Sequence, residues 1–71
     1  MTTPGERLRA LRTHAGLSLR ELGKRAQIDH AYLARMEADK APSPVYQTVA
    51  RIARELGVST DTLMQGERDA S

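Results

Sequence analysis

Hydrophobic residues recur at three- and four-residue spacing along most of the chain, which is the period of amphipathic helices. The clearest stretch is 16–37, where two short amphipathic segments follow each other with only a few residues between them. The residues expected on the inner faces are Leu19, Leu22 and Ala26 in the first segment, and Leu33, Met36 and Glu37 in the second. Two helices joined so closely must meet at a steep angle, and such a pair can lay its second helix in a DNA major groove.

Capping residues and glycines predict where the helices begin and end. Ser18 followed by Glu21 is a capping box, in which each side chain accepts a hydrogen bond from a backbone N–H at the helix start. The N-cap candidates are Thr3, Ser18, Asp29, Ser43 and Ser59, and the glycines expected at helix ends are Gly16, Gly57 and Gly66. We therefore expect five helices, over about 4–15, 18–26, 30–38, 44–56 and 60–66.

The fourth helix is predicted from Ser43 and Pro44, read as a cap and a first-turn proline. Its expected apolar face is Val45, Val49, Ile52, Ala53 and Leu56. The connections are short and nothing alternates with the period of a strand, so the fold class is all-α, a five-helix bundle. We assign residues 1–66 to one domain and expect the polar tail 67–71 to fray.

The composition limits the core and the chemistry. A chain of 71 residues forms one small domain. Phe, Trp and Cys are absent, and Tyr32 and Tyr46 are the only aromatic residues, so the core must consist of aliphatic residues and Met. Without Cys there is no disulfide and no thiolate metal site, which fits a cytoplasmic protein. No apolar run is long enough for a signal peptide or a membrane span.

The charge is small but unevenly distributed. The net charge is +2; residues 1–40 carry eight Lys/Arg against five Asp/Glu, and residues 41–71 carry three against four. The basic residues near the two-helix unit are Arg20, Lys24, Arg25, Arg35 and Lys40. Such a cluster suits a phosphate backbone, although the charge taken alone favours a solvated helix surface.

The chain resembles the lambda-repressor-like helix-turn-helix family, the Cro, phage-repressor or Xre type. The resemblance covers about Glu6 to Met64, and it depends on an ordered set of residues rather than on a single motif. These residues are Leu8 and Arg12, then Gly16-Leu17-Ser18 with Glu21-Leu22, then Leu33 and Glu37, and finally Ile52-Ala53, Leu56-Gly57-Val58-Ser59 and Leu63. In this family the second and third helices form the helix-turn-helix, and the third enters the major groove.

The resemblance implies a set of site residues. The candidates for contacts with base edges are Asp29, His30, Ala31, Ala34 and Arg35. The candidates for contacts with phosphates are Ser18, Arg20, Tyr32 and Lys40, with the start of the second helix supplying free N–H groups. A partly buried salt bridge between Arg12 and Glu37 would tie the first helix to the third.

Plain structural roles compete with several of these assignments. Arg35 could instead pair with Glu37 or Asp39 on the surface. His30 could be simply solvated, and Tyr32 could be partly buried against the bundle.

The chain departs from the family pattern at four positions. Leu19 replaces a glutamine that contacts phosphate or base, and Gly23 replaces a common alanine at a cost of about 1 kcal/mol in helix propensity. Gln27 replaces the usual turn glycine; a left-handed backbone there would cost roughly 1–2 kcal/mol. Asp39 replaces the glycine after the third helix and places a negative charge near the expected DNA backbone.

The leading hypothesis is a sequence-specific DNA-binding transcriptional regulator that acts as a homodimer on double-stranded DNA. Val58, Leu63 and Met64 would form the dimer contact, or else close the core. The alternative is a protein-interaction module, such as an antitoxin or accessory factor, because the same fold serves there. Phage-type repressors, restriction–modification controllers and antitoxins all share this pattern.

An enzyme is not expected. The chain has no glycine-rich phosphate loop and no metal-spaced His cluster, and we expect no cofactor and no metal.

Overall fold

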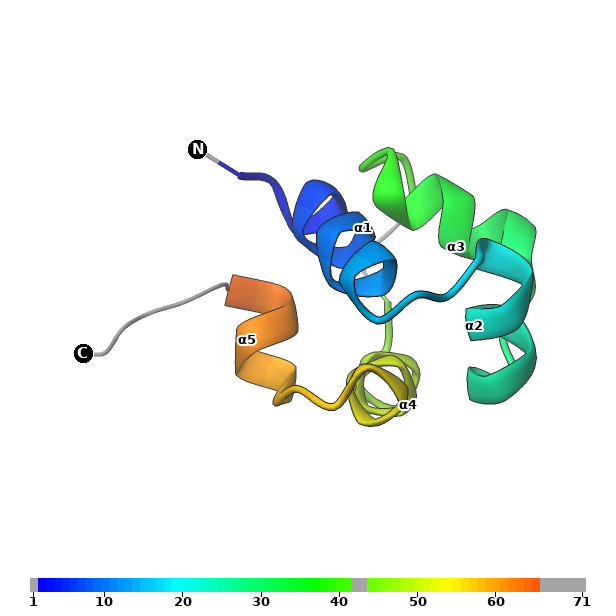
Figure 1. The fold of residues 1–71 in the computed structure, drawn as a ribbon. Helices are drawn as coiled ribbons and strands as arrows, with labels where there is room; N and C mark the ends of the chain where they lie inside the picture. The colour runs from blue at the N-terminus through cyan, green and yellow to red at the C-terminus, as the bar shows by residue number, and fades with distance from the viewer. Residues whose placement is uncertain (1, 42–43, 66–71) are drawn as a thin grey trace.

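The five helices form a ring in which each packs against two others. The computed structural model describes residues 2–41 and 44–65. Its helices are α1 (Pro4–His14), α2 (Leu19–Ala26), α3 (His30–Glu37), α4 (Tyr46–Leu56) and α5 (Thr60–Gln65), with no β-strand in these residues. The principal contacts run α1 to α3, α3 to α2, α2 to α4, α4 to α5 and α5 back to α1 (Figure 1). The prediction of an all-α bundle of five helices is confirmed.

The ring closes around a core of aliphatic side chains. The fully buried residues Leu22, Leu33 and Ile52 come from α2, α3 and α4. The rest of the core is Leu8, Ala26, Val49, Ala53 and Leu63. Each large side chain contributes about 1.5–3 kcal/mol on burial, so this small set has to carry most of the stability of the fold. Leu63 is only 3% exposed and therefore closes the core.

The predicted N-cap residues are confirmed in α1, α2, α3 and α5, with Asp29 accepting from Ala31 N at the start of α3. Capping boxes begin α1 and α2: Thr3 Oγ1 accepts from Glu6 N at 3.1 Å, and Ser18 Oγ accepts from Glu21 N at 3.0 Å. Ser59 Oγ likewise accepts from Thr62 N at 3.0 Å at the start of α5. Gly16 and Gly57 take left-handed conformations, with φ of 77° and 72°. Gly66 and the tail 67–71 lie outside the described residues.

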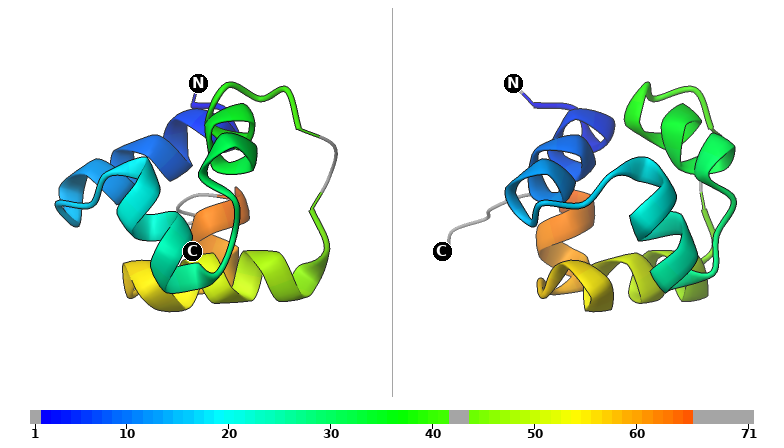
Figure 2. Two further views of the ribbon diagram at one scale, coloured as in Figure 1. Left: turned by 90° about the vertical axis from the view of Figure 1, so that its right-hand side faces the viewer. Right: turned by 45° about the vertical axis from the view of Figure 1, so that its right-hand side comes forward.

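The predicted start of α4 is wrong. The helix begins at Tyr46, and Val45 occupies the N-cap position without a side-chain capping bond. Val45 is 66% exposed, so it does not belong to the apolar face. Figure 2 shows the end of α3 at the top of the molecule and α4 along the bottom. Val45 has extended backbone, with φ of −72° and ψ of 156°, so the first helical turn predicted at Pro44 does not form. Ser43 lies outside the described residues.

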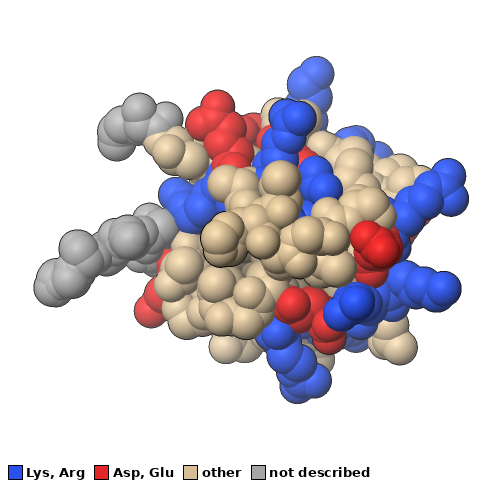
Figure 3. Space-filling view, in the orientation of Figure 1, with Lys and Arg blue, Asp and Glu red and all other residues tan. Residues whose placement is uncertain are grey.

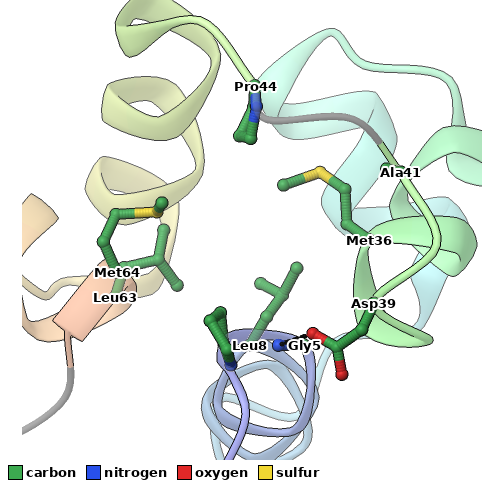
Figure 4. A pocket seen from close by; sticks show the side chains of 9 residues that line it. Gly5, Leu8, Met36, Asp39, Ala41, Pro44, Leu63 and Met64 are labelled. Atoms are coloured by element: carbon green, nitrogen blue, oxygen red, sulfur yellow. Dashed lines mark hydrogen bonds between the residues drawn. The ribbon is translucent and has the colours of Figure 1, made fainter.

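Hydrogen bonds of the Asp39 side chain link the end of α3 to the start of α1. Its Oδ1 accepts from Gly5 N at 2.8 Å, and its Oδ2 accepts from Thr3 Oγ1 at 2.6 Å. The two elements lie so close that a Cβ added at Gly5 would stand 2.5 Å from the carbonyl oxygens of Met36 and Glu37. Figure 4 shows the Gly5–Asp39 bond at the rim of a pocket of about 210 Å³ between α1, α3 and α5. The carboxylate thus acts as a long-range cap for a helix N-terminus, where negative charge is favoured.

Two non-glycine residues, Gln27 and Asp39, have left-handed backbone with φ of 60°. Substitution by glycine should change the stability of the fold in opposite directions at these two positions. We expect Gln27→Gly to stabilise the fold by about 0.5–1 kcal/mol, because it relieves the left-handed penalty at an exposed position. Asp39→Gly should destabilise it by about 1–2 kcal/mol, because the loss of both hydrogen bonds outweighs the same relief. Urea denaturation measures both, with Asp39→Asn as the control that keeps one acceptor. Changes of the same sign would contradict the role assigned to Asp39.

Candidate nucleic-acid interface

The turn between α2 and α3 depends on a close backbone approach at Gly23. A Cβ added there would stand 2.5 Å from the carbonyl oxygen of Ile28 and 3.4 Å from the nitrogen of His30. Gly23 O also accepts from Ile28 N at 2.8 Å, and Gln27 adopts the left-handed conformation that reverses the chain. The sequence flagged Gly23 and Gln27 as departures from the family pattern. The structure shows that the glycine is required by its contact with the turn.

Arg12 and Glu37 hold the other end of α3. Arg12 Nε donates to Glu37 Oε2 at 2.6 Å, and Nη2 donates to Oε1 at 3.1 Å. Arg12 Nη1 donates to the carbonyl oxygen of Leu17 at 2.8 Å. The side chains are 14% and 8% exposed. Hydrogen bonding to Glu37 raises the pKa of the Arg12 guanidinium above its ordinary value. The pair joins α1, the α1–α2 connection and α3.

The five residues expected to contact base edges are all exposed. Four belong to α3, where Ala31 and Arg35 lie on the side opposite the buried Leu33, and Asp29 precedes the helix as its N-cap. The Asp29 carboxylate accepts from Ala31 N at 3.4 Å and lies 4.0 Å from His30 Nδ1. The structure therefore brings these candidates together on one surface.

Tyr32 and Arg35 lie one turn apart on α3. The Arg35 guanidinium carbon is 5.7 Å from the centroid of the Tyr32 ring. Tyr32 itself is half-buried, which agrees with the structural alternative stated above.

The start of α2 presents backbone donors beside a basic side chain. The capping box uses the N–H groups of Ser18 and Glu21. The N–H groups of Leu19 and Arg20 have no acceptor inside the helix, as at any helix start. Hydrogen bonds from Ser18 lower the pKa of the Glu21 carboxyl. The bond from the Ser18 backbone N–H has the larger effect, and the bond from its hydroxyl has the smaller one.

A shallow depression joins α2 to the start of α3. Its lining brings Arg20 and Lys24 beside Asp29 and His30. Figure 3 shows Lys and Arg side chains projecting on this right-hand side of the molecule, over α2. Lys24, which belongs to the basic cluster described from the sequence but was not among the candidates for phosphate contacts, lies one turn after Arg20. Lys40 is exposed beyond α3. Arg25 instead lines a separate depression with Arg51 and Arg54 of α4.

Within residues 2–41 and 44–65, no helix combines the length and the apolar character that crossing a membrane requires. No group of three or more His, Cys, Asp or Glu side chains there is placed to hold a metal ion.

The comparisons place the chain in a family. Residues 5–65 match the model of a helix-turn-helix domain, so the chain belongs to that family, and its fold is of the lambda-repressor-like type. The N-terminal DNA-binding domain of SinR from Bacillus subtilis is 30% identical, with a TM-score of 0.83 over 94% of this chain and 96% of that one. A crystal structure of SinR in complex with DNA is 31% identical, with a TM-score of 0.82 over 86% and 97%.

Two other structures extend the comparison. The P22 c2 repressor in complex with a synthetic operator is 24% identical, with a TM-score of 0.87 over 94% of this chain and all of that one, and it supports the fold alone. A SinR–SinI complex matches at 29% identity and a TM-score of 0.83, over 92% of this chain; the chain spans 63% of its counterpart's length. No match is found among curated proteins.

Removing one partner of the Arg12–Glu37 pair should be costly. We expect Glu37→Ala to destabilise the domain by about 2–4 kcal/mol, because it leaves the Arg12 guanidinium largely buried without its carboxylate. The free energy of unfolding in urea measures this loss. In the double variant Arg12→Met with Glu37→Leu, much of the loss should be recovered. An unchanged melting temperature in Glu37→Ala would contradict a role for the pair in holding α3.

The capping box of α2 should contribute less stability in acid. Because the pKa of Glu21 is lowered in the folded chain, its contribution is present above the unfolded value, near pH 4.3, and is lost as the pH falls through the folded value. The matched variant is Glu21→Gln, which keeps a hydrogen-bonding group without the titration. The stability of the wild type relative to Glu21→Gln, measured by urea denaturation, should fall between about pH 6 and pH 3. A difference that does not change with pH would contradict this assignment.

Proposed function

We propose that the protein is a DNA-binding transcriptional regulator that reads the major groove with α3. The observation that carries this proposal is the outward face of α3, which is exposed along its first turns while Leu33 and Glu37 fix its inner face. An α-helix presented in this way fits the width of the major groove. Family membership and the DNA complex of a 31% identical SinR domain support the same function.

The side chains on this face suggest which bases they read. Arg35 has the planar fork that fits O6 and N7 of guanine. His30 can donate to the same guanine atoms, and the exposed carboxylate of Asp29 can accept from the amino group of cytosine. Ala31 and Ala34 offer methyl groups that fit beside the methyl of thymine.

The phosphates would be bound on both sides of the reading face. Arg20 and the free N–H groups at the start of α2 lie on one side, with Lys24 in the same depression. Ser18 can add its hydroxyl, although that oxygen already accepts from Glu21 N. Lys40, exposed just beyond α3, supplies a charge at the other end of the helix.

We further propose that two copies bind a two-fold operator. One domain presents too few base-reading side chains for high specificity, and two copies on half-sites about 34–36 Å apart would supply it. Of the three residues expected at a dimer contact, Leu63 is buried and Val58 packs against the core. Met64, 38% exposed, is the remaining candidate.

A protein partner is the second candidate function. A similar chain occurs in the SinR–SinI complex, which favours a protein-binding surface on this fold. From the sequence, the negative charge of Asp39 was expected near the DNA backbone, where it would favour this alternative. Its carboxylate accepts hydrogen bonds from Thr3 and Gly5, which gives Asp39 a structural role at the end of α3.

In-vitro selection of bound oligonucleotides, followed by fluorescence anisotropy, tests the regulator proposal. We expect an enriched motif with half-sites about one helical turn apart. Arg35→Ala should lose about 5- to 150-fold of discrimination at one base pair, because the guanine fork is removed. The matched variant Lys40→Ala should weaken all sequences alike and reduce the salt dependence. Binding that depends on salt but is indifferent to sequence would contradict the proposal, and a stoichiometric protein partner with no DNA retained would favour the second candidate.

A further inference from the structure

We infer that Tyr32 is a positioning residue for Arg35, and that it acts through its ring rather than through its hydroxyl. This inference rests on the proposed function and deepens it, because it assigns the reading of a guanine to a two-residue unit of α3. The observation is the Arg35 guanidinium carbon 5.7 Å from the centroid of the Tyr32 ring. At this distance the face of an aromatic ring attracts a cation.

The backbone that carries the Tyr32 ring is held in place by contacts at the start of α3. Tyr32 N donates to Asp29 O at 3.0 Å in the first turn of α3, so its backbone belongs to the capped start of the helix. The next residue, Leu33, is fully buried, which fixes the rotation of α3 about its axis. The half-buried ring has only two side-chain torsions, and it therefore offers a more ordered surface than Arg35 would find in solvent.

The acidic residues that could draw Arg35 away are engaged elsewhere. Both carboxylate oxygens of Glu37 accept from Arg12. Both carboxylate oxygens of Asp39 accept from the start of α1, from Gly5 N and from Thr3 Oγ1. These were the two ion-pair partners weighed for Arg35 from the sequence, and their internal bonds leave the ring as its close neighbour.

The consequence for DNA binding is pre-organisation. A guanidinium that stacks on a ring keeps the N–H donors at its edge free to fork onto guanine O6 and N7. Part of the ordering of the long Arg35 side chain is then complete before binding, so less is lost when the contact forms. A hydroxyl contact to phosphate, the role first expected for Tyr32, would instead add affinity without regard to sequence.

The experiment compares Tyr32→Phe and Tyr32→Leu in the full chain, each in the wild-type and the Arg35→Ala backgrounds. Anisotropy measures binding to the selected duplex and to a duplex with 7-deazaguanine at the guanine that Arg35 reads. Tyr32→Phe should keep affinity and discrimination within about twofold. Tyr32→Leu should bind the guanine duplex about three- to fivefold more weakly, and it should weaken binding to the 7-deazaguanine duplex, which keeps O6 but lacks N7, by a smaller factor. In the Arg35→Ala background it should have no further effect.

The contrary results are distinct. If Tyr32→Phe weakens binding to every sequence and reduces the salt dependence, the hydroxyl contacts phosphate and the inference is overturned. An equal loss on both duplexes in Tyr32→Leu would overturn it too. So would the absence of upfield ring-current shifts of the Arg35 side-chain protons in the free wild-type protein. A wild-type chain without preference for any sequence would overturn the proposed function, and the positioning role with it.

Discussion

The orientation of α3 depends on the two-pronged hydrogen bond between Arg12 and Glu37. The buried side chain of Leu33 anchors the middle of α3 in the core, but this apolar contact alone would allow α3 to rotate and slide. The guanidinium fixes the last turn of α3 to α1 and, through Leu17 O, to the chain that leads into α2. Gly23 fixes the first turn by letting the α2 backbone come close to it. With both ends held, the outer face of an eight-residue helix becomes a rigid surface.

Three acidic residues near this surface are held by bonds within the fold. Glu37 is paired with Arg12, whereas Asp39 accepts from the start of α1 and Glu21 accepts from Ser18. Asp39 and Glu21 are exposed and keep their negative charge, and the basic side chains Arg20, Lys24, Arg35 and Lys40 are exposed as well. These four cations can face a phosphate backbone although the net charge of the chain is only +2.

Local signals predicted most of the helix ends, because a cap acts within three or four residues. Thr3, Ser18 and Ser59 are examples, and Gly16 and Gly57 are the matching stops. The predicted start of α4 is wrong because the point where the chain re-enters a helix after α3 depends on how the whole bundle packs, not on local residues. The Arg12–Glu37 pair was expected only from the family resemblance, since nothing in the spacing brings those residues together.

Contacts distant in sequence explain what else was missed. The Gly5–Asp39 bond joins residues 34 positions apart, so no local pattern predicts it. From the sequence, Asp39 indicated only a negative charge near the DNA backbone. The Tyr32–Arg35 contact spans three positions and was visible in principle. For Arg35 the sequence predicted a base contact, with a surface ion pair as the alternative, and neither interpretation involves the Tyr32 ring.

The central claim is that the outer face of α3 is the surface that meets DNA. The most direct measurement is an NMR titration of the 15N-labelled protein with a duplex obtained by selection, following the backbone amides. We expect the largest shifts at residues 29–35 and at the start of α2, with α5 little affected. Large shifts on α5 with unchanged signals from α3 would contradict the claim.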